Sequence, residues 1–377
     1  MKILFVCENY LPHLGGAEVV FKNLAERYVK RGHQVSLITH RLKGTKKREN
    51  INGVEVYRIN CFNSRYLFSF FAVSKVIELA RDHDIIQTTS FNGAPPAWLG
   101  SKVCGKPVII TVHEVWADKW QQVTNFSWLK SKVHQILERA IYFLPYDKYL
   151  CVSNATKHDL LKLKINKSKV ETVYNGLDYK FWNTEKYLNV DEIRSKLDLE
   201  NKFSCFAWGR PGVSKGFDYL LKAVPLIIKQ VPNFHLILML GSKEKYQAKY
   251  QELIELISKL KLDNYVRVID AAPYQQLGNY IKAADCIIIP SIAEGFGYTT
   301  VEAAALGKPL VVSDAGSLPE VVSGKHLMFK SKDIADLAEK VVMASKDEYQ
   351  ETPLKRFEWE PSVEKYLDVY SSLITLD

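Results

Sequence analysis

Short apolar runs alternate with helical periods along the chain. The first run, Lys2–Cys7, is mostly apolar and ends at the polar Glu8, as a buried parallel strand does where it leaves its sheet. Over residues 17–30 the apolar positions recur every three or four residues, which predicts an amphipathic helix. Gly32 ends this helix, and Val35–Thr39 is the next strand. Loops at the carboxyl ends of such parallel strands are where open α/β sheets bind ligands.

The same alternation continues in two blocks, separated by the charged residues 184–202. In the first block we expect further strands at 54–59, 85–88, 108–112, 149–153 and 170–174, and helices near 66–80, 94–103, 128–144 and 154–164. In the second we expect strands at 203–208, 235–240, 266–270, 286–290 and 310–313, and helices from 217, over 244–261, from 298, over 333–345 and over 361–375. Strands that alternate with helices predict an α/β protein with two doubly wound parallel sheets.

The composition agrees with this organisation. The 377 residues are too many for one ordinary core and fit two domains, and the contents of 47% hydrophobic and 25% charged residues are typical of soluble globular proteins. No run of 18 apolar residues predicts a membrane span, and the N-terminus becomes polar too soon for a signal peptide. The six cysteines are scattered singly, without the spacing of a metal site or disulfide framework. We therefore expect a cytoplasmic protein.

The charge favours an anionic partner without identifying it. With 51 basic and 42 acidic residues the formal charge is +9, which suits a nucleotide sugar, an anionic lipid surface or nucleic acid. No nucleic-acid-binding motif accompanies this charge, so we expect no nucleic acid partner. The basic segment Arg41–Arg48 and the apolar cluster Tyr66–Phe71 have two open interpretations: a solvated loop beside a helix start, or a peripheral contact with an anionic membrane.

A glycine-rich turn follows the strand expected at 286–290. The strand ends at Pro290-Ser291, and Gly295-Phe296-Gly297 leads into a helix that opens near Tyr298. Glycines let the backbone approach a ligand closely, and the helix N-terminus offers free N–H groups and a partial positive charge. Phosphate binds readily at such a place. The turn therefore predicts an anion-binding site.

Two carboxylates flank this anion site, Glu294 before the turn and Glu302 within the helix. At about 1.5 Å of rise per residue, eight helical positions span at most roughly 12 Å. A nucleotide sugar has a matching layout, with a sugar, a diphosphate and a ribose. Because glycine-rich turns occur in many doubly wound folds, it is the spacing of the two glutamates that favours a sugar-nucleotide site.

A second glycine-rich loop follows the strand expected at 203–208. Arg210 and Lys215 project from it in the order G-R-x-x-x-x-K-G. Arginine offers a planar fork of donors to phosphate oxygens and lysine a point charge. The loop is not a P-loop, because Gly216 follows Lys215 where Ser or Thr would be needed.

These motifs together resemble the retaining glycosyltransferases of family 4, in the glycosyltransferase group 1 family. The resemblance rests on E-x7-E around G-F-G after P-S, on G-R-x-x-x-x-K-G, on Gly15-Gly16-Ala17-Glu18, on Asn175-Gly176-Leu177-Asp178 and on Gly316-Ser317-Leu318-Pro319-Glu320. It spans nearly the whole chain and is strongest over residues 203–322. One departure is Lys325-His326, where the family commonly has Asn-Gly.

The resemblance implies the GT-B fold, with two doubly wound Rossmann-like domains facing a central cleft. The acceptor-side domain would comprise residues 1–183, with the C-terminal helix 358–377 packing back on it, and the nucleotide-sugar-binding domain residues 184–357. The implied activity is transfer of a glycosyl group from a nucleoside-diphosphate sugar, of UDP or GDP type, with retained anomeric configuration. The acceptor would be a glycan or lipid-linked precursor at the cytoplasmic face of a membrane.

The resemblance also implies residue roles. Arg210, Lys215 and the N–H groups of Gly295–Gly297 would hold the diphosphate, Glu294 the sugar and Glu302 the ribose. His113 would point at the donor sugar, Asp270 and Ala271 would lie at the nucleobase, and Gly15 and Gly16 would approach the donor phosphate or the acceptor. The expected catalytic residues are His113, Glu294, Arg210 and Lys215, and the donor-binding set further includes Phe296 and Tyr298.

No metal or cofactor is expected, because no Asp-x-Asp motif occurs and two cations already face the diphosphate. Two other interpretations stay open: a GT-B epimerase or phosphorylase acting on nucleotide sugars, and a non-catalytic protein that binds them. A dehydrogenase is disfavoured, since no G-x-G-x-x-G follows the first strand.

Overall fold

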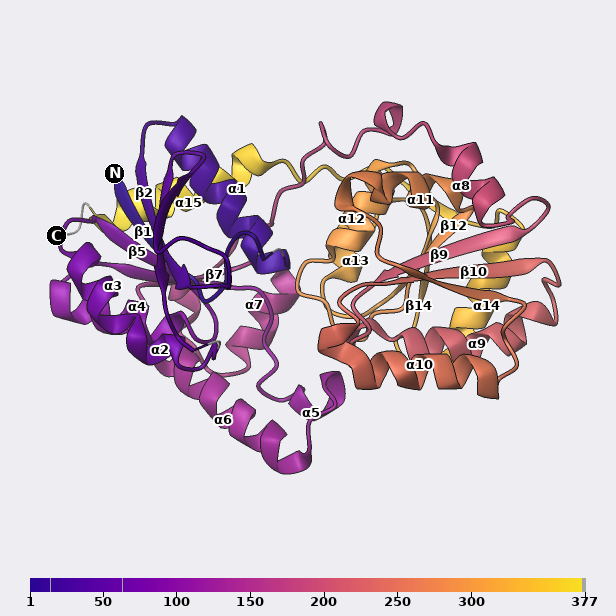
Figure 1. The fold of residues 1–377 in the computed structure, drawn as a ribbon, viewed down its shortest axis with the longest axis horizontal. Coiled ribbons are helices and arrows are strands. Elements are labelled where there is room, and N and C mark those ends of the chain that lie inside the picture. The colour runs from indigo at the N-terminus through magenta and orange to yellow at the C-terminus, as the bar shows by residue number, and fades with distance from the viewer. Residues whose placement is uncertain (14, 63, 375–377) are drawn as a thin grey trace. The chain divides into compact units, whose positions relative to one another are not determined.

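The computed structural model describes residues 1–13, 15–62 and 64–374, which form two compact units (Figure 1). The first unit contains residues 1–118, 129–176 and the chain from Glu358 on, and the second contains residues 119–128 and 177–357. The last three residues of the helix predicted over 358–377 lie outside the described residues. Each unit is built around one predominantly parallel sheet, as the alternating pattern predicts.

The sheet of the first unit has the strand order β3-β4-β2-β1-β5-β6-β7-β8. Its strands are β1 (Lys2–Val6), β2 (Gln34–His40), β3 (Arg48–Ile51), β4 (Val54–Ile59), β5 (Ile85–Thr89), β6 (Val108–Val112), β7 (Lys148–Cys151) and β8 (Val170–Thr172). The pairs are parallel, apart from the antiparallel pair that β3 makes with β4. The order reverses between β1 and β5, so the loops that follow these two strands flank a topological switch point.

Helices cover both faces of this sheet because alternate strand residues point to opposite sides. Helices α1 (Gly16–Lys30) and α15 (Trp359–Ile374) pack on the face of Phe5 and Leu37. The other face, with Leu4 and Ile86, packs against α2 (Phe68–Phe71), α3 (Val73–Ala80), α4 (Ala94–Cys104), α6 (Trp128–Phe143) and α7 (Asn154–Leu161). The C-terminal helix is tied to the first, since Tyr28 Oη donates to Tyr370 Oη over 3.3 Å.

The sheet of the second unit has the order β11-β10-β9-β12-β13-β14-β15. Its strands are β9 (Phe203–Gly209), β10 (Phe234–Leu240), β11 (Val266–Asp270), β12 (Cys286–Ile289), β13 (Leu310–Ser313), β14 (Gly324–Phe329) and β15 (Gln350–Thr352). Helices α9 (Phe217–Ile228), α10 (Gln247–Lys259) and α14 (Ile334–Ser345) pack into its main core. Figure 1 shows α8 (Val190–Lys196), α11 (Leu277–Ala283), α12 (Tyr298–Ala305) and α13 (Leu318–Val321) on the opposite face.

The second unit includes two segments that the sequence places in the first domain. Residues 119–128 contain the short helix α5 (Trp120–Val123), which lies against the 3-10 turn η3 (Val213–Lys215). Residues 177–183 belong to the second unit because Phe181 and Trp182 pack on its aromatic side chains. The division by packing therefore assigns these two segments differently from the predicted boundary at 183/184.

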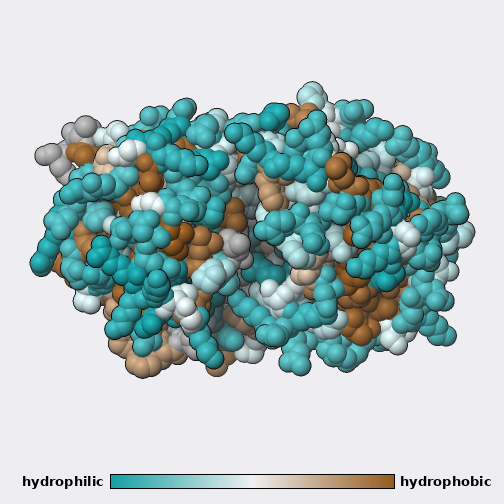
Figure 2. All heavy atoms as spheres, turned by 45° about the horizontal axis from the view of Figure 1, so that its top comes forward, coloured by the Kyte–Doolittle hydropathy of each residue, from teal (hydrophilic) through white to brown (hydrophobic). Residues whose placement is uncertain are grey.

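The surface and the cysteines add two facts. Figure 2 shows one face of the molecule, where hydrophilic residues cover most of the surface and hydrophobic side chains gather in patches. Cys104 is partly exposed, the other five cysteines are buried, and all six are free thiols. Within residues 1–13, 15–62 and 64–374, no helix has the length and hydrophobicity needed to cross a membrane.

Candidate functional site

The predicted donor site lies at the switch point of the second sheet. The strand order reverses between β9 and β12, so the loops that follow these strands, residues 210–216 and 290–297, flank the reversal. Ligands bind at such points in open α/β sheets, beyond the carboxyl ends of the strands. The first loop carries Arg210 and Lys215, and the second carries Glu294.

Backbone contacts hold these two loops together. The carbonyl of Ser214 accepts a hydrogen bond of 2.8 Å from Ile292 N. Gly216 has a φ of +66°, and a Cβ at this position would lie 2.0 Å from the carbonyl oxygen of Pro290. The φ and the close approach both require glycine here, since an L side chain is strained at this φ and would collide with the backbone directly after β12. The contact places Lys215 beside the end of β12.

Glu294 is fixed through both its side chain and its backbone. Its carboxylate contacts Lys215 Nζ and accepts a hydrogen bond of 3.1 Å from Ser291 Oγ. Its carbonyl accepts a hydrogen bond of 3.2 Å from Ser317 N, and a Cβ on Gly316 would lie 2.2 Å from the same oxygen. The turn that contains the G-x-x-P-E motif is therefore a support for Glu294.

The N-terminus of α12 lies behind Glu294. Gly297 precedes the helix with a φ of +89°, and its carbonyl accepts a bond of 3.0 Å from Thr300 N. The Thr299 hydroxyl is buried without a hydrogen-bond partner among the described residues. Thr299 lines a small cavity together with Lys215 and Trp208. Unpaired donors and a cation meet here, which is the chemistry that an oxyanion requires.

Glu302 is buried one helical turn further along α12. Its side chain is 6% exposed, and Tyr274 Oη donates to its Oε1 over 3.3 Å. Burial raises the pKa of Glu302 to about 8, and Glu294 adds to the shift, while Tyr274 and Lys215 oppose it. At neutral pH this carboxyl therefore holds its proton, and it offers one donor as well as acceptors.

An aromatic cluster next to Glu302 was not predicted from the sequence. Tyr274 stacks on Phe181 with ring centres 5.0 Å apart and packs edge-on against Trp182 at 5.6 Å. The stacking explains why Tyr274 reaches Glu302 although the residue is half exposed. The only signal in the sequence is the place of Tyr274 shortly after the predicted strand 266–270.

Arg210 and Asp270 take less enclosed positions. Arg210 is exposed and makes no ion pair within the part of the chain that the structure describes. Asp270 ends β11, is 77% exposed and pairs with Lys243. Ala271 lies beside Gly241 at the end of β10, since a Cβ on that glycine would be 3.4 Å from its methyl group. These residues line the carboxyl ends of β9, β10 and β11 without touching Glu294.

The first unit holds the remaining predicted residues around the start of α1. Gly15 and Gly16 open this helix. Glu18 in its first turn bends back over Gly15 toward His13, with Glu18 Oε1 3.3 Å from His13 Nδ1. Burial would raise the pKa of Glu18, but its hydrogen bonds to His13 and to its own N–H, and His113, lower it overall. The N-terminus of α1 therefore already faces a carboxylate of the protein, that of Glu18.

His113 follows β6 and contacts the Phe21 ring of α1, with ring centres 6.2 Å apart. Burial lowers the pKa of His113 to about 4, although Glu18 opposes the shift. Its Nε2 is buried without a hydrogen-bond partner among the described residues. The imidazole is therefore neutral at physiological pH, and its Nε2 is available to a ligand.

A polar cluster at the switch point of the first sheet was also missed. Glu8, directly after β1, is 8% exposed and pairs with Arg65 Nη2 at 2.8 Å. Asn92, in the loop after β5, donates to the other oxygen of the same carboxylate. Gly93 allows this approach, since a Cβ there would lie 2.6 Å from the carbonyl of Val6. Glu8 was assigned only to a loop because its partners lie far away in the sequence.

The structure therefore gathers the predicted residues into two sets, one in each unit. The first unit contains Gly15, Gly16 and His113. The second unit brings together Lys215, Glu294, Gly295–Gly297, Tyr298 and Glu302, and it places Arg210, Asp270 and Ala271 along the same sheet edge. Among the described residues, no group of three His, Cys, Asp or Glu side chains is placed to hold a metal ion.

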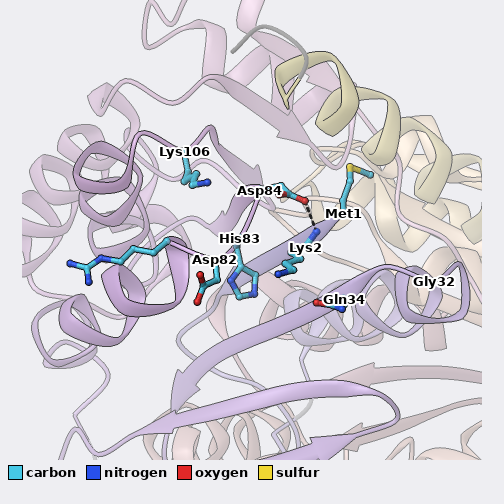
Figure 3. Close-up of a pocket in the computed structure, with 9 residues that line it drawn as sticks. Met1, Lys2, Gly32, Gln34, Asp82, His83, Asp84 and Lys106 are labelled. Carbon is cyan, nitrogen blue, oxygen red and sulfur yellow. Dashed lines mark hydrogen bonds between the residues drawn. The ribbon is translucent and has the colours of Figure 1, made fainter.

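A larger pocket, of about 440 Å³, lies at the opposite end of β1 (Figure 3). Met1, Lys2, Gln34 and Asp84 line it, and Asp84 accepts a hydrogen bond of 2.7 Å from Lys2 N. This is the amino-terminal edge of the sheet, where parallel folds do not place their ligands. None of the predicted site residues lines this pocket.

Two family matches cover most of the chain. Residues 14–181 match Glycosyltransferase Family 4, and residues 189–357 match Glycosyl transferases group 1. An uncharacterized glycosyltransferase of Methanocaldococcus jannaschii is 27% identical over 347 residues, which are 86% of this chain and 83% of that protein. The alpha-monoglucosyldiacylglycerol synthase of Streptococcus pneumoniae is 25% identical over 93% of this chain and 80% of its own length.

A yeast protein and two solved structures are also similar to this chain. A phosphatidylinositol N-acetylglucosaminyltransferase subunit of Saccharomyces cerevisiae is 21% identical over 98% of this chain and 83% of that protein. The sucrose-phosphate synthase of Thermosynechococcus elongatus superposes with a TM-score of 0.79 at 19% identity, with full coverage of both chains. HepE of Anabaena, in complex with UDP and glucose, gives 0.75 at 21% identity over 99% of this chain and 100% of its own. Both structures share the two-domain α/β architecture.

Proposed function

We propose a specific reaction for this chain, which belongs to the glycosyltransferase group 1 family and carries the family 4 domain in its first half. The reaction is transfer of a glycosyl group from a nucleoside-diphosphate sugar to an acceptor, with retention of the anomeric configuration. The observation that carries it is the Lys215–Glu294 ion pair at the switch point, with the N-terminus of α12 behind it. A cation, a helix N-terminus and two glutamate side chains together match the parts of such a donor.

The diphosphate would lie on Lys215, Arg210 and the N–H groups of residues 295–297. Arg210 is exposed and makes no ion pair within the described residues, so its guanidinium is available to a phosphate. Lys215 is paired with Glu294 before the donor binds. A diphosphate carries more negative charge than one carboxylate, so it would compete for Lys215. Glu294 would then be released to accept hydrogen bonds from the hydroxyl groups of the sugar.

Glu302 would bind the ribose. Its raised pKa keeps the carboxyl neutral, so a ribose hydroxyl would gain a hydrogen bond without an uncompensated buried charge. Tyr274 orients the carboxyl through its hydroxyl group and shields it with its ring. The loop of Asp270 and Ala271 lies at the end of β11 in the same sheet, where backbone groups would hold the nucleobase.

The chemistry would be electrostatic, with no protein nucleophile. As the bond between sugar and diphosphate breaks, negative charge grows on the leaving phosphate, and preorganised cations and N–H groups stabilise it. The leaving phosphate would take the proton of the acceptor hydroxyl on the same face of the sugar, and this accounts for retention. His113, neutral at pH 7, would hydrogen-bond the donor sugar through its free Nε2. No metal ion would be required.

The acceptor is proposed to be a glycan or lipid-linked precursor. Two relatives are named for lipids, phosphatidylinositol in one case and diacylglycerol in the other. We place the reaction at the cytoplasmic face of a membrane. The polar cluster of Glu8, Asn92 and Arg65 provides buried hydrogen-bonding groups for acceptor hydroxyls on the first unit.

A donor screen tests the proposal. The pure protein is heated with UDP- and GDP-linked sugars, because a ligand that binds only the folded state raises the melting temperature. We expect one or two donors to stabilise the protein and to be turned over with a lipid or glycan acceptor. The variant Lys215→Met should lose the shift, while Lys222→Met, on an exposed lysine of α9, should keep it. A screen in which no nucleotide sugar stabilises the wild type would contradict the proposal.

A further inference from the structure

Helix α6 exposes its apolar residues and buries its polar ones. Leu129, Val133, Ile136, Leu137 and Phe143 are between 46% and 67% exposed. Their spacing of three, four or seven residues places them on one stripe of the helix. The buried positions are instead Ser131, Glu138 and Tyr142. An ordinary surface helix of a globular protein has the reverse arrangement.

The buried polar residues of α6 bind the loop that follows β6. Glu138 Oε1 accepts a hydrogen bond of 2.8 Å from Trp116 N, and Tyr142 Oη donates over 2.9 Å to the carbonyl of Glu114. These bonds fix the loop that follows β6. The inner face of α6 therefore anchors the helix by itself, and the outer apolar stripe contributes nothing to the core.

The stripe continues onto two neighbouring helices. Phe70 and Phe71 of α2 are 74% and 47% exposed, and Val103 of α4 is 56% exposed. Tyr66, just before α2, contacts His134 of α6, with 3.3 Å between Tyr66 Oη and His134 Nε2. Helices α2, α4 and α6 pack on the same core cluster, so their outer sides face one way (Figure 1). We call this surface the α2–α4–α6 face.

Its charges identify the partner. The exposed charged residues of α4 and α6 are Lys102, Lys130 and Lys132, and the one acidic residue of these helices, Glu138, is buried. Arg139 of α6 is paired at 2.7 Å with the exposed Asp118, so this pair adds no net charge. Apolar side chains together with an excess of lysines fit the interface of an anionic bilayer. A second copy of the chain would instead bring like charges together.

We propose that the α2–α4–α6 face docks on an anionic lipid bilayer. Its apolar side chains would enter the boundary between headgroups and acyl chains, and its lysines would contact anionic headgroups. This surface keeps the Tyr66–Phe71 cluster expected from the sequence but takes its positive charge from α4 and α6 instead of Arg41–Arg48. The proposal deepens the proposed function by supplying a route to a lipid-linked acceptor, but membrane binding itself does not depend on that activity.

Vesicle flotation of the full chain tests the docking. We expect flotation with phosphatidylcholine vesicles that contain phosphatidylglycerol, weaker flotation with pure phosphatidylcholine, and a decline as salt rises because exposed charges are screened. A surface lysine contributes about fivefold to membrane partitioning, so Lys130→Gln/Lys132→Gln should reduce partitioning roughly 25-fold. The triple variant Leu129→Gln/Ile136→Gln/Leu137→Gln should abolish flotation.

The control replaces three exposed leucines outside the α2–α4–α6 face. Leu188, Leu226 and Leu354 of the second unit are 78%, 38% and 58% exposed, and their triple change to Gln should leave flotation unchanged. Equal loss in both triple variants, or a wild type that does not float, would overturn the proposal. A wild-type dimer that the α6 variant disperses, without vesicle binding, would assign the face to a second copy. The α6 variant should still bind the nucleotide. A wild type that floats with vesicles but binds no nucleotide would refute only the proposed function.

Discussion

At the scale of single residues, the site depends on which charges are paired before a ligand arrives. Lys215 and Glu294 neutralise each other, whereas Glu302 avoids an unpaired buried charge by keeping its proton. The two glutamates therefore have different electrostatic states, although they lie eight positions apart on the same stretch. Different states predict different consequences when each is replaced.

Glu294→Gln should lower kcat strongly and leave nucleoside-diphosphate binding almost unchanged. In the proposed mechanism the carboxylate strengthens its contacts as positive charge grows on the sugar, and losing such a contact costs on the order of 10²–10³ in kcat. Steady-state kinetics together with calorimetric titration of the product nucleotide would measure both effects. A variant that binds the nucleotide poorly but keeps kcat would show that Glu294 does not face the sugar.

Glu302→Gln should change the pH dependence of stability. Between pH 4.5 and about 8 the unfolded chain has an ionised Glu302 while the folded protein keeps the proton, so unfolding releases a proton. As the pH rises across this window, the wild type should therefore lose stability relative to the variant, by up to about 1.4 kcal/mol per pH unit. Urea unfolding of both proteins at pH 5 and pH 8 would show it. A constant difference would mean that Glu302 is ionised in the folded protein.

At the scale of elements, the parallel strands of the first sheet and most of those of the second could be predicted from sequence, whereas the antiparallel edge strands β3 and β15 could not. Buried strands such as β6 and β13 are mostly apolar runs, and the structure has them at the predicted bounds. The edge strands β3 and β15 were missed because their side chains are partly or fully exposed and show no apolar pattern. The short helices α5, α8, α11 and α13 were missed as well, because each spans at most seven residues. β14 was missed because its first half, Gly324-Lys325-His326, is not apolar.

In the site, too, residues in local sequence motifs could be predicted, whereas contacts between residues far apart in the sequence could not. Glycine-rich loops beside predicted strands were visible as motifs, and the structure brings Lys215, Glu294 and the start of α12 together. Tyr274 and Asn92 were missed because their hydrogen bonds reach 28 and 84 positions along the chain. Helix α6 was predicted near its true bounds, but which of its faces is buried depends on partners that the period does not reveal.

Gly316→Ala should damage the site through a backbone contact. The residue has a φ of +56°, and the added Cβ would lie 2.2 Å from the Glu294 carbonyl. We expect a loss of roughly 1–3 kcal/mol of stability from the strained conformation and the clash, and a lower kcat/KM because Glu294 is displaced.

Gly307→Ala is the matched control for that experiment. Gly307 has a φ of +69°, with no atom within 4 Å of an added Cβ. The control shares the cost of the left-handed conformation but not the collision. Thermal unfolding and kinetics of both variants separate the two effects. If Gly307→Ala lowers kcat/KM as much as Gly316→Ala does, the turn is not a support for Glu294.

At the scale of the whole molecule, two sheets of similar winding each place their functional loops at a strand-order reversal. In the first unit these loops carry Glu8 and Asn92, and in the second they carry Lys215 and Glu294. The clusters differ in chemistry: in the first, Asn92 and Arg65 both bind the Glu8 carboxylate, and in the second, Lys215 and the exposed Arg210 lie on the loop beside the N-terminus of α12. This difference suits an acceptor in one unit and an anionic donor in the other.

Transfer should not depend on a divalent metal. Arg210, Lys215 and the N-terminus of α12 provide positive charge at the proposed diphosphate position, which is the neutralising task that a metal performs in other transferases. Activity should therefore persist in excess EDTA. Complete loss of activity in the chelator, with recovery on addition of manganese, would contradict this account of the site.

The most direct test of the donor site is calorimetric titration of the nucleoside diphosphate released from the preferred donor. A hydrogen bond to a charged group is worth about 1.5–3 kcal/mol, so Lys215→Met should weaken the affinity by roughly 10- to 150-fold. Lys222→Met, which removes an exposed lysine paired with Asp218, should bind as the wild type does. An unchanged Kd in Lys215→Met would contradict the placement of the diphosphate between the β9 and β12 loops.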